Sequence, residues 1–281
     1  MNWLSNQPSR KSTFIANSLT NTTQKWSKPN GIHMVGTVEK YLKNKIEDEG
    51  AIHITLVDPE KVDVKSASHV AHVAESCQTV AIMVGGSTVI STSHLDDVVK
   101  AIKKTVRVPV ILFPNNVTGI SRYADAIWFM SLLNSADPYF ILGAQVLAAP
   151  FIRKFGLETI PMGYIVVGEG GTAGVIGKVC PIPFSKPELA VAHALAAQYL
   201  GMRFVYLEAG SGAKQSVPNA MVKMVRDLTN VTLVVGGGIR NGRKARDIVN
   251  AGAQIIVTGT VTEESKVKEK LTELVKNIKV K

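Results

Sequence analysis

Two short apolar runs near the C-terminus end in glycine and constrain the fold more than any other feature. They are Val234-Val-Gly-Gly-Gly-Ile-Arg240 and Ile255-Ile-Val-Thr-Gly-Thr-Val261, and each precedes a helix-like segment. Glycines between a strand and a helix N-terminus let backbone N–H groups approach an anion, and the helix dipole favours negative charge there. Two such turns in successive strand–helix units predict a phosphate-binding corner. The alternative is that both are merely tight turns.

Strand-like and helix-like segments alternate along the rest of the chain. Strands are expected at 52–57, 80–84, 108–113, 126–133, 162–167, 203–207, 231–235 and 254–257, and helices at 64–76, 95–104, 139–155, 187–200, 217–229, 241–251 and 263–276. A further amphipathic helix at 37–49 would cover the bottom of the sheet. Eight such repeats predict an α/β chain with a single (β/α)₈ barrel, in which phosphate binds after strands 7 and 8. A doubly wound sheet is the alternative.

One crossover in this pattern is defective. The segment 114–125 carries Pro114, Asn115, Asn116 and Gly119, which make it a poor helix. We expect helix 3 to be missing or replaced by irregular chain, which would open a groove suited to a long apolar ligand. Trp128 and Phe129 could line that groove, face a second copy of the chain, or pack in the core. The Gly-rich stretch 168–183 is expected to be a long loop, functional or mobile.

Composition excludes several classes of protein. The chain has 281 residues, 46% of them apolar, and a net charge of +10 that would attract acidic partners, including phosphorylated metabolites. No basic run is interleaved with aromatics, so nucleic acid is not an expected partner. No apolar run has transmembrane length. Residues 1–33 lack a signal-peptide core and are expected to form a disordered extension, or to precede a true start at Met34, before a barrel domain at 34–281. Cys77 and Cys180 are expected to be small buried residues.

Polar residues at the predicted strand ends are the candidates for chemistry, because barrel active sites lie there. Asp58 and Ser87 are hard oxygen ligands on neighbouring strands, which suit Mg²⁺; Asp58 could instead cap a helix or set a turn. Glu208 closes an apolar strand and is either a base or paired with a cation such as a lysine. The other strand-end residues are Lys61, Thr88, Asn134, Asp137, Tyr206, Gly210, Ser211, Gly212, Gly237, Gly238, Gly259 and Thr260. His69 and His72 share a helix face without a third ligand, so we expect surface or packing roles.

These residues, in this order, resemble the geranylgeranylglyceryl phosphate synthase family, which includes the bacterial heptaprenylglyceryl phosphate synthases. The resemblance spans about 38–276. The motifs that carry it are His53-Ile-Thr-Leu-Val-Asp-Pro-Glu-Lys61, Gly85-Gly-Ser87, Leu133-Asn-Ser-Ala-Asp137, Gly163-Tyr-Ile-Val166, Tyr206-Leu-Glu-Ala-Gly-Ser-Gly-Ala213, Gly236-Gly-Gly-Ile239 and Gly259-Thr260. It implies a barrel whose third helix is replaced. The implied reaction joins the C3 hydroxyl of sn-glycerol 1-phosphate to C1 of geranylgeranyl diphosphate through an ether bond, with release of pyrophosphate.

The resemblance also implies roles for residues. Asp58 and Ser87 would bind Mg²⁺, and Glu208 and Tyr206 would be catalytic. Glycerol 1-phosphate would contact Tyr206, Leu207, Glu208, Ala209, Gly210, Ser211, Gly212, Gly237, Gly238, Gly259 and Thr260. Leu56 stands where some members have a lysine, so Lys61 or Lys178 is the candidate to assist the diphosphate. The form Leu-Glu-Ala-Gly-Ser-Gly is similar to the archaeal branch, which favours a C20 donor.

The family resemblance further implies a homo-oligomer, dimer or hexamer. Because donor and product are insoluble, we expect a cytoplasmic protein in transient contact with membrane lipid. Two other functions stay open at this point. Another phosphate-binding barrel enzyme, such as a phosphosugar isomerase or lyase, would share the glycine turns but not the acidic metal corner. A non-catalytic basic protein that binds membranes or nucleic acid would have no use for Glu208 at a strand end.

Overall fold

Eight parallel strands close into one barrel in chain order. The computed structural model describes residues 35–86, 91–259 and 266–279, so the predictions on residues 1–33, Met34, Ser87, Thr88 and Thr260 lie outside it. The strands are β1 (Ile52–Val57), β2 (Ala81–Val84), β3 (Val110–Leu112), β4 (Ala126–Leu132), β5 (Glu158–Val166), β6 (Phe204–Glu208), β7 (Thr232–Gly236) and β8 (Ile255–Thr258). Parallel pairing of β1 with β8 closes the barrel and excludes a doubly wound sheet. The predicted barrel is therefore confirmed.

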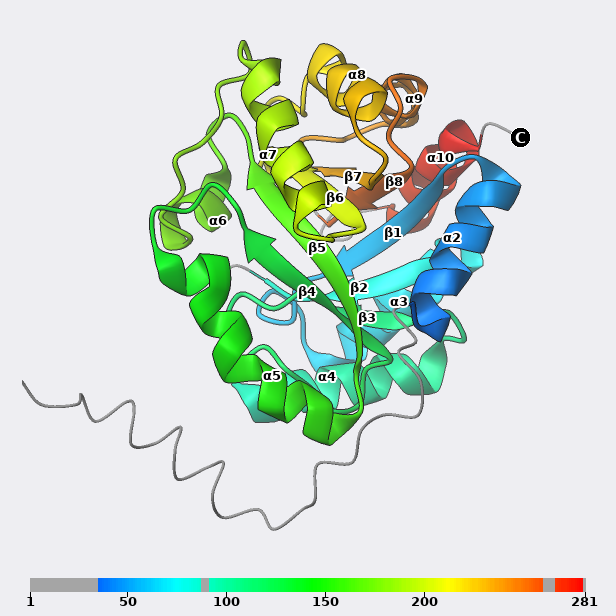
Figure 1. The fold of residues 1–281 in the computed structure, drawn as a ribbon. Coiled ribbons are helices and arrows are strands. Elements are labelled where there is room, and N and C mark those ends of the chain that lie inside the picture. The colour runs from blue at the N-terminus through cyan, green and yellow to red at the C-terminus, as the bar shows by residue number, and fades with distance from the viewer. Residues whose placement is uncertain (1–34, 87–90, 260–265, 280–281) are drawn as a thin grey trace, which may run out of the picture. The chain divides into compact units, whose positions relative to one another are not determined.

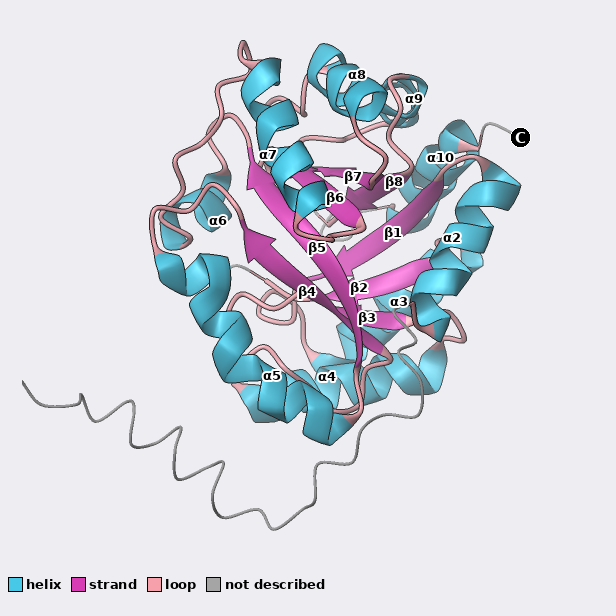
Figure 2. Cartoon of the chain, viewed as in Figure 1, coloured by secondary structure: helices cyan, strands magenta, loops and turns pink. Residues whose placement is uncertain are grey.

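Helices surround the barrel between most of the strands (Figures 1 and 2). They are α2 (Thr37–Glu49), α3 (Val64–Ser76), α4 (Thr92–Thr105), α5 (Ala144–Phe155), α6 (Gly171–Ile176), α7 (Pro187–Tyr199), α8 (Asn219–Leu228), α9 (Gly242–Asn250) and α10 (Val267–Ile278), with a π-helical turn η1 (Tyr139–Gly143) before α5. No described helix is both long and apolar enough to cross a bilayer.

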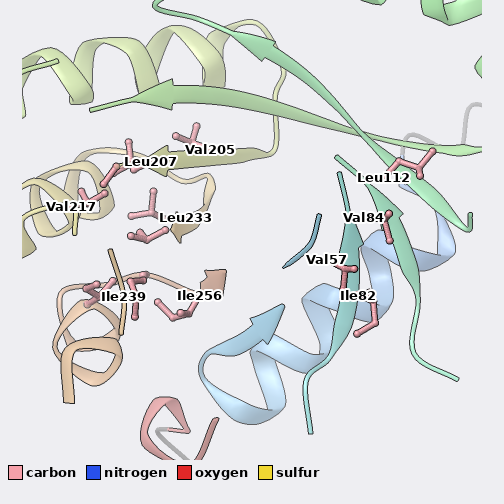
Figure 3. Packing of buried hydrophobic residues seen from close by; sticks show 14 of the residues in the cluster. Val57, Ile82, Val84, Leu112, Val205, Leu207, Val217, Leu233, Ile239 and Ile256 are labelled. Carbon is pink, nitrogen blue, oxygen red and sulfur yellow. The ribbon is translucent and has the colours of Figure 1, made fainter. Parts of the chain in front are cut away.

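Apolar side chains form two layers, one inside the barrel and one between strands and helices. Alternation along each strand divides them. In β1, Ile52 and Ile54 face the interior, where they join Trp128 and Phe204. Val57 belongs to the outer layer, with the side chains drawn in Figure 3. Since both faces of each strand are buried, the strands are nearly continuous apolar runs.

Helix α2 lies across the end of the barrel at which the strands begin (Figure 1). Val38, Leu42 and Ile46 pack against the interior cluster. Buried Glu39 accepts two hydrogen bonds of 2.6 Å from the Arg203 guanidinium. The first turn is capped from outside, because Glu158 accepts from the backbone N–H groups of Val38 at 2.9 Å and Glu39 at 2.8 Å. Helix α2 therefore covers the bottom of the barrel as expected, held there by apolar packing and by the hydrogen bonds of Glu39 and Glu158.

The connection between β3 and β4 contains no helix over its full described length, residues 113–125. Asn116 starts a side-chain turn there, since its Oδ1 accepts from Thr118 N–H at 2.7 Å. Asn and Pro favour such local turns over a helix. The wall of helices is therefore interrupted between α4 and α5.

Three sequence expectations need correction. The stretch 168–183 is not all loop, because it contains α6. Strand β5 begins at Glu158 rather than at residue 162, so Pro161 lies inside the strand opposite Phe129. Cys180 is exposed, whereas Cys77 is buried as expected. His69 and His72 are both exposed, in agreement with the predicted surface role.

Candidate active site

A pocket opens at the carboxyl ends of β6, β7 and β8, where the glycine turns were predicted to meet. Its lining comes from the ends of six strands or the turns after them. The lining residues are Leu56, Phe113, Tyr164, Ala173, Tyr206, Glu208, Ser211, Gly212, Gly237, Gly238, Ile239, Arg240, Val257, Thr258 and Gly259. Seven of the predicted ligand residues are among them. We call this cavity the phosphate pocket.

Three predicted ligand residues in the segment after β6 are placed differently. Leu207 and Ala209 have their side chains in the outer hydrophobic layer, and Figure 3 shows Leu207 there beside Val205. Alternation of side chains along a strand requires this orientation once Tyr206 and Glu208 face the mouth. Gly210 contributes its backbone N–H to Glu208. Any part that Leu207 and Ala209 play in binding therefore belongs to their backbone.

Gly237 and Gly238 are glycines for steric reasons. Their φ angles are 80° and 68°, in the left-handed region. A Cβ on Gly237 would lie 2.6 Å from Oε1 of Glu208, and one on Gly238 would lie 2.6 Å from the backbone carbon of Gln215. The turn after β7 therefore packs directly on the β6 loop, and its backbone forms the wall of the pocket.

Glu208 is the buried acid of this pocket. It ends β6, is 7% exposed, and its Oε1 accepts from Gly210 N–H at 2.7 Å. Burial raises the pKa of this carboxyl, opposed by hydrogen bonds from Tyr206 and from Gly210 N–H. No described lysine or arginine forms an ion pair with it, which argues against the structural salt bridge considered above. A buried carboxylate with a raised pKa is suited to accept a proton.

Three aromatic rings stand beside Glu208. The ring centroid of Phe113 lies 5.4 Å from that of Tyr164 and 5.7 Å from that of Tyr206, and the two tyrosine centroids are 5.3 Å apart. Burial, and then the charge of Glu208, raises the pKa of both tyrosines well above the ordinary value. Both phenols therefore stay neutral and can donate hydrogen bonds.

An apolar groove lies next to the rings of Phe113 and Tyr164. It lies between β4, α5, α6 and the helix-free segment after β3, and its empty space, together with the open solvent at its mouth, is about 830 Å³. Its lining residues are Gly86, Phe113, Pro114, Asn115, Asn116, Ile120, Ile127, Trp128, Phe129, Met130, Leu132, Phe140, Ala144, Gln145, Ala148, Ile152, Tyr164, Ala173, Ile176 and Gly177. Phe113, Tyr164 and Ala173 line both cavities. The groove and the phosphate pocket therefore adjoin at these three residues. Trp128 and Phe129 are both among the residues that line the groove, and Trp128 is at the same time buried in the interior cluster, with its ring centroid 5.2 Å from that of Phe204.

The predicted strand-end residues Asn134 and Asp137 face neither cavity but clamp α6 over their junction. Asn134 donates to the carbonyls of Val166 at 2.8 Å and Cys180 at 3.0 Å. Asp137 pairs with Lys178 at 2.8 Å, which lowers the pKa of the Asp137 carboxyl through that hydrogen bond. Lys178, one candidate to assist a diphosphate, therefore already holds a structural contact.

Asp58 lies at the end of β1, next to strand β2. Its Oδ1 accepts from Glu60 N–H at 3.1 Å and its carbonyl from Lys61 N–H at 3.1 Å, which makes a turn. The helix cap is instead Asp63, whose carboxylate accepts from Ser66 N–H at 2.7 Å, so the capping alternative for Asp58 is wrong. A Cβ on Gly86 would lie 2.8 Å from Cγ of Asp58. Because Gly86 has no side chain, the Asp58 carboxylate packs directly on this glycine, which lines the groove. Of the two alternatives considered for Asp58, the turn is therefore confirmed.

Sequence reasoning missed several residues of this site. Arg240 lines the phosphate pocket, and its guanidinium donates to the carbonyls of Gly212 at 3.2 Å and Ala213 at 3.3 Å. Its position directly after the β7 glycine turn was the available signal. Phe113 and Tyr164 line both cavities. In the sequence, their residue types did not distinguish them from aromatic residues of the core.

The fold and the site together define a (β/α)₈-barrel protein with a phosphate pocket joined to an apolar groove. The chain belongs to the PcrB family, whose model matches residues 43–278. Geranylgeranylglyceryl phosphate synthase of Thermofilum pendens is 52% identical over 232 residues, 83% of this chain and 91% of that relative. The enzyme of the same name from Pyrococcus furiosus is 54% identical over 231 residues, 82% of this chain and 92% of that relative.

Solved structures agree with these relatives. One is the crystal structure of (S)-3-O-geranylgeranylglyceryl phosphate synthase from Thermoplasma acidophilum in complex with its substrate sn-glycerol 1-phosphate. It superposes with a TM-score of 0.84 at 40% identity, and covers 88% of this chain and 99% of its own. Thiamine phosphate pyrophosphorylase from Pyrococcus furiosus shares only the fold, with a TM-score of 0.55 at 14% identity.

Proposed function

We propose that this protein is a geranylgeranylglyceryl phosphate synthase. It transfers the prenyl group of geranylgeranyl diphosphate to the C3 hydroxyl of sn-glycerol 1-phosphate and releases pyrophosphate. The observation that carries the proposal is that the two cavities adjoin, with Phe113, Tyr164 and Ala173 lining both. A polar, phosphorylated acceptor and a long apolar donor can meet only where two such cavities join.

Glycerol 1-phosphate occupies the phosphate pocket in this proposal. The turns at Gly237–Gly238 and at Gly259 present backbone N–H groups to the phosphate near the N-terminus of α9. Arg240 adds a positive charge at the same pocket. Thr260, assigned to the same turn, lies outside the described residues. These groups fix the acceptor by its charged end and leave its hydroxyls toward β6.

Glu208 then binds the glycerol hydroxyls and accepts the proton of the C3 hydroxyl as that oxygen attacks the prenyl carbon. Gly210 N–H holds one carboxylate oxygen, and Tyr206 donates a hydrogen bond to the same group. Positive charge develops on the prenyl carbon as the carbon–oxygen bond to the diphosphate breaks. The carboxylate, in a site lined by Phe113 and Tyr164, stabilises that charge without reorganising.

Asp58 and Ser87 would hold Mg²⁺ at the opposite side of the mouth. The contact of the Asp58 carboxylate with Gly86, which lines the groove, supports this assignment, while Ser87 is outside the described part of the chain. When bound, the cation offsets the negative charge of the diphosphate leaving group. Lys61, in the turn that Asp58 forms, is the remaining candidate to assist that group.

The prenyl chain lies in the apolar groove, between Phe129 of β4 and the side chains of α5. We assign a C20 donor on the form of the β6 motif. We further propose a cytoplasmic enzyme that takes its donor from, and returns its product to, membrane lipid by transient contact. Residues 1–33 are proposed to be an extension that takes no part in the barrel at 34–281.

A homo-oligomer, dimer or hexamer, is part of the proposal. Helix α7 is apolar on its outer side, where Leu189, Tyr199 and Leu200 are 44%, 79% and 70% exposed. A second copy of the chain covering this face would remove that surface from water. Analytical ultracentrifugation of the protein and of the double variant Tyr199→Ser, Leu200→Ser tests it; an unchanged sedimentation coefficient would place the contact elsewhere.

The activity is tested by incubating the protein with labelled sn-glycerol 1-phosphate, geranylgeranyl diphosphate and Mg²⁺, then extracting with organic solvent. Label in the organic phase is expected, and none with Asp58→Asn. If no lipid-soluble label forms in the wild type, the proposed function is wrong. A phosphosugar isomerase or lyase would instead turn over a soluble phosphosugar alone, a reaction that gives the apolar groove no role.

A further inference from the structure

A buried chain of hydrogen bonds lies on the outer face of β1 and ends at Thr258, which lines the phosphate pocket. Its members are His53, Thr55, Thr79 and Thr258, which are 1%, 0%, 2% and 4% exposed. The imidazole of His53 is its centre: Nδ1 lies 2.9 Å from Oγ1 of Thr79, and Nε2 lies 2.9 Å from Oγ1 of Thr258. Neither the proposed phosphate contacts nor the proposed proton transfer uses His53.

The direction of these bonds follows from donor counting. The Thr79 hydroxyl donates to the His53 carbonyl at 3.1 Å and accepts from the Thr55 hydroxyl at 3.1 Å. Since a hydroxyl has one hydrogen, Thr79 can only accept from the ring, so Nδ1 carries the proton. Nε2 then lacks a hydrogen and must accept from Thr258. The burial that lowers the pKa of His53 to about 4 keeps this neutral form at physiological pH.

Thr258 connects this chain of bonds to the site. It is the last residue of β8, pairs in register with Thr55 of β1, and is followed directly by Gly259. Both Thr258 and Gly259 line the phosphate pocket. The hydroxyl of Thr258 is therefore held from behind at the point where the strand gives way to the predicted phosphate turn. Fixing that side chain fixes the peptide that leads into the turn.

We propose that His53 is a positioning residue that orients Gly259, the first residue of the predicted phosphate turn after β8, through Thr258. The inference rests on the proposed function, in which this turn binds the phosphate of the acceptor. Stability alone does not explain the arrangement, because an apolar set of the same shape can replace a buried pair of hydrogen-bonding groups at little cost. Groups behind a site that lock the rotamer of a pocket residue are the usual support for exact ligand geometry.

Four variants separate positioning from packing. Thr258→Val removes the hydroxyl at the turn, and Thr79→Val removes the partner at the other end of the ring. His53→Asn reproduces only the Nδ1 position and reaches Thr79 but not Thr258. His53→Gln reproduces the Nε2 position and can still accept from Thr258. Thr258→Val removes one hydrogen bond of this chain and Thr79→Val removes three, so loosening of the barrel alone would act more strongly in Thr79→Val. Thermal unfolding of all four variants provides the control for stability.

The measured quantities are KM for sn-glycerol 1-phosphate, KM for the prenyl diphosphate, kcat and the dissociation constant of inorganic phosphate. Thr258→Val and His53→Asn are expected to raise the acceptor KM and the phosphate dissociation constant roughly three- to tenfold, the worth of one hydrogen bond. The KM for the prenyl diphosphate should stay unchanged in both. Thr79→Val and His53→Gln should leave the acceptor KM within about twofold, although Thr79→Val loses at least as much thermal stability as Thr258→Val.

Two results would overturn the inference. One is an unchanged phosphate dissociation constant in Thr258→Val despite lowered thermal stability. The other is an equal rise of the acceptor KM in Thr79→Val and Thr258→Val, which would show general loosening of the barrel. Inorganic phosphate reports on the turn whatever the natural acceptor is. Failure of the proposed function would appear separately, as a wild-type protein that binds phosphate but forms no prenyl ether.

Discussion

Replacing Gly237 by alanine tests whether the β7 turn positions the catalytic carboxylate as well as the phosphate. The φ angle of Gly237 is 80°, and an added Cβ would lie 2.6 Å from Oε1 of Glu208 and 2.7 Å from N of Gly210. Those two atoms are the partners of the 2.7 Å hydrogen bond that fixes Glu208. The methyl group must therefore push them apart.

Two costs add in this variant. An alanine in left-handed backbone costs about 1–2 kcal/mol of folding stability. Loss of a hydrogen bond to a charged group costs about 1.5–3 kcal/mol more, which corresponds to roughly a 10- to 100-fold fall in kcat/KM if the transition state uses that geometry. The second cost should appear in catalysis, because the displaced carboxylate is the proton acceptor.

Gly201→Ala is the matched control. Gly201 has a φ of 83°, and nothing lies within 4 Å of its added Cβ. It follows α7 and lines neither the phosphate pocket nor the apolar groove. By urea denaturation both variants should lose the cost of a left-handed alanine, about 1–2 kcal/mol, and Gly237→Ala should lose about 1.5–3 kcal/mol more. Only Gly237→Ala should lose kcat/KM for glycerol 1-phosphate. Full activity in Gly237→Ala would refute the assigned role of the Glu208–Gly210 contact.

Three further outcomes are expected. Glu208→Gln should lower kcat about 10²- to 10⁴-fold, the usual contribution of a general base. Wild-type activity should rise with pH through the raised pKa of Glu208, and a flat pH–rate profile would contradict this role. Ala148→Phe, on the groove side of α5, should raise KM for a C20 diphosphate more than for a C10 diphosphate, measured side by side, and equal changes would place the chain elsewhere. Burial lowers the pKa of His53 from 6.5 to about 4, so the folded protein resists protonation of the ring and the free energy of unfolding should fall by about 3 kcal/mol as pH drops from 6.5 to 4. Denaturation of wild type and His53→Gln across that pH range checks this. Parallel curves of stability against pH would show that His53 is not the group responsible.

The phosphate corner could be predicted from the sequence because its determinants are local. A glycine that must adopt positive φ, as at Gly237 and Gly238, leaves its mark at that position of the chain. The alternation of buried strands with amphipathic helices is equally local, and it fixed the number and order of the strands. The third crossover was anticipated for the same reason, since Pro114, Asn115 and Asn116 disfavour a helix on their own.

The clamp around α6 could not be predicted, because its partners are distant in the chain. Gly171–Ile176 contains two glycines, and its composition favours loop over helix. What holds it is tertiary: Ser135 Oγ donates to the carbonyl of Gly177 at 2.6 Å, and Asn134 binds backbone on both sides of the segment. The motif Leu133-Asn-Ser-Ala-Asp137 was noticed as polar residues at a strand end, but its function depends on residues that a local pattern does not identify.

The missing helix also explains where affinity for an apolar chain comes from. In a complete barrel unit, a helix between β3 and β4 would cover the outward side chains of those strands. Here the outward Ile127 is 1% exposed, in one cluster with Ile120 of the irregular segment, but the outward Phe129 is left only half-buried along the groove. Apolar surface that folding leaves in contact with water gains about 25 cal/mol per Å² when a ligand covers it. A prenyl chain in this groove therefore completes the hydrophobic layer that the chain itself leaves unfinished, whereas a soluble phosphosugar would leave that surface in water.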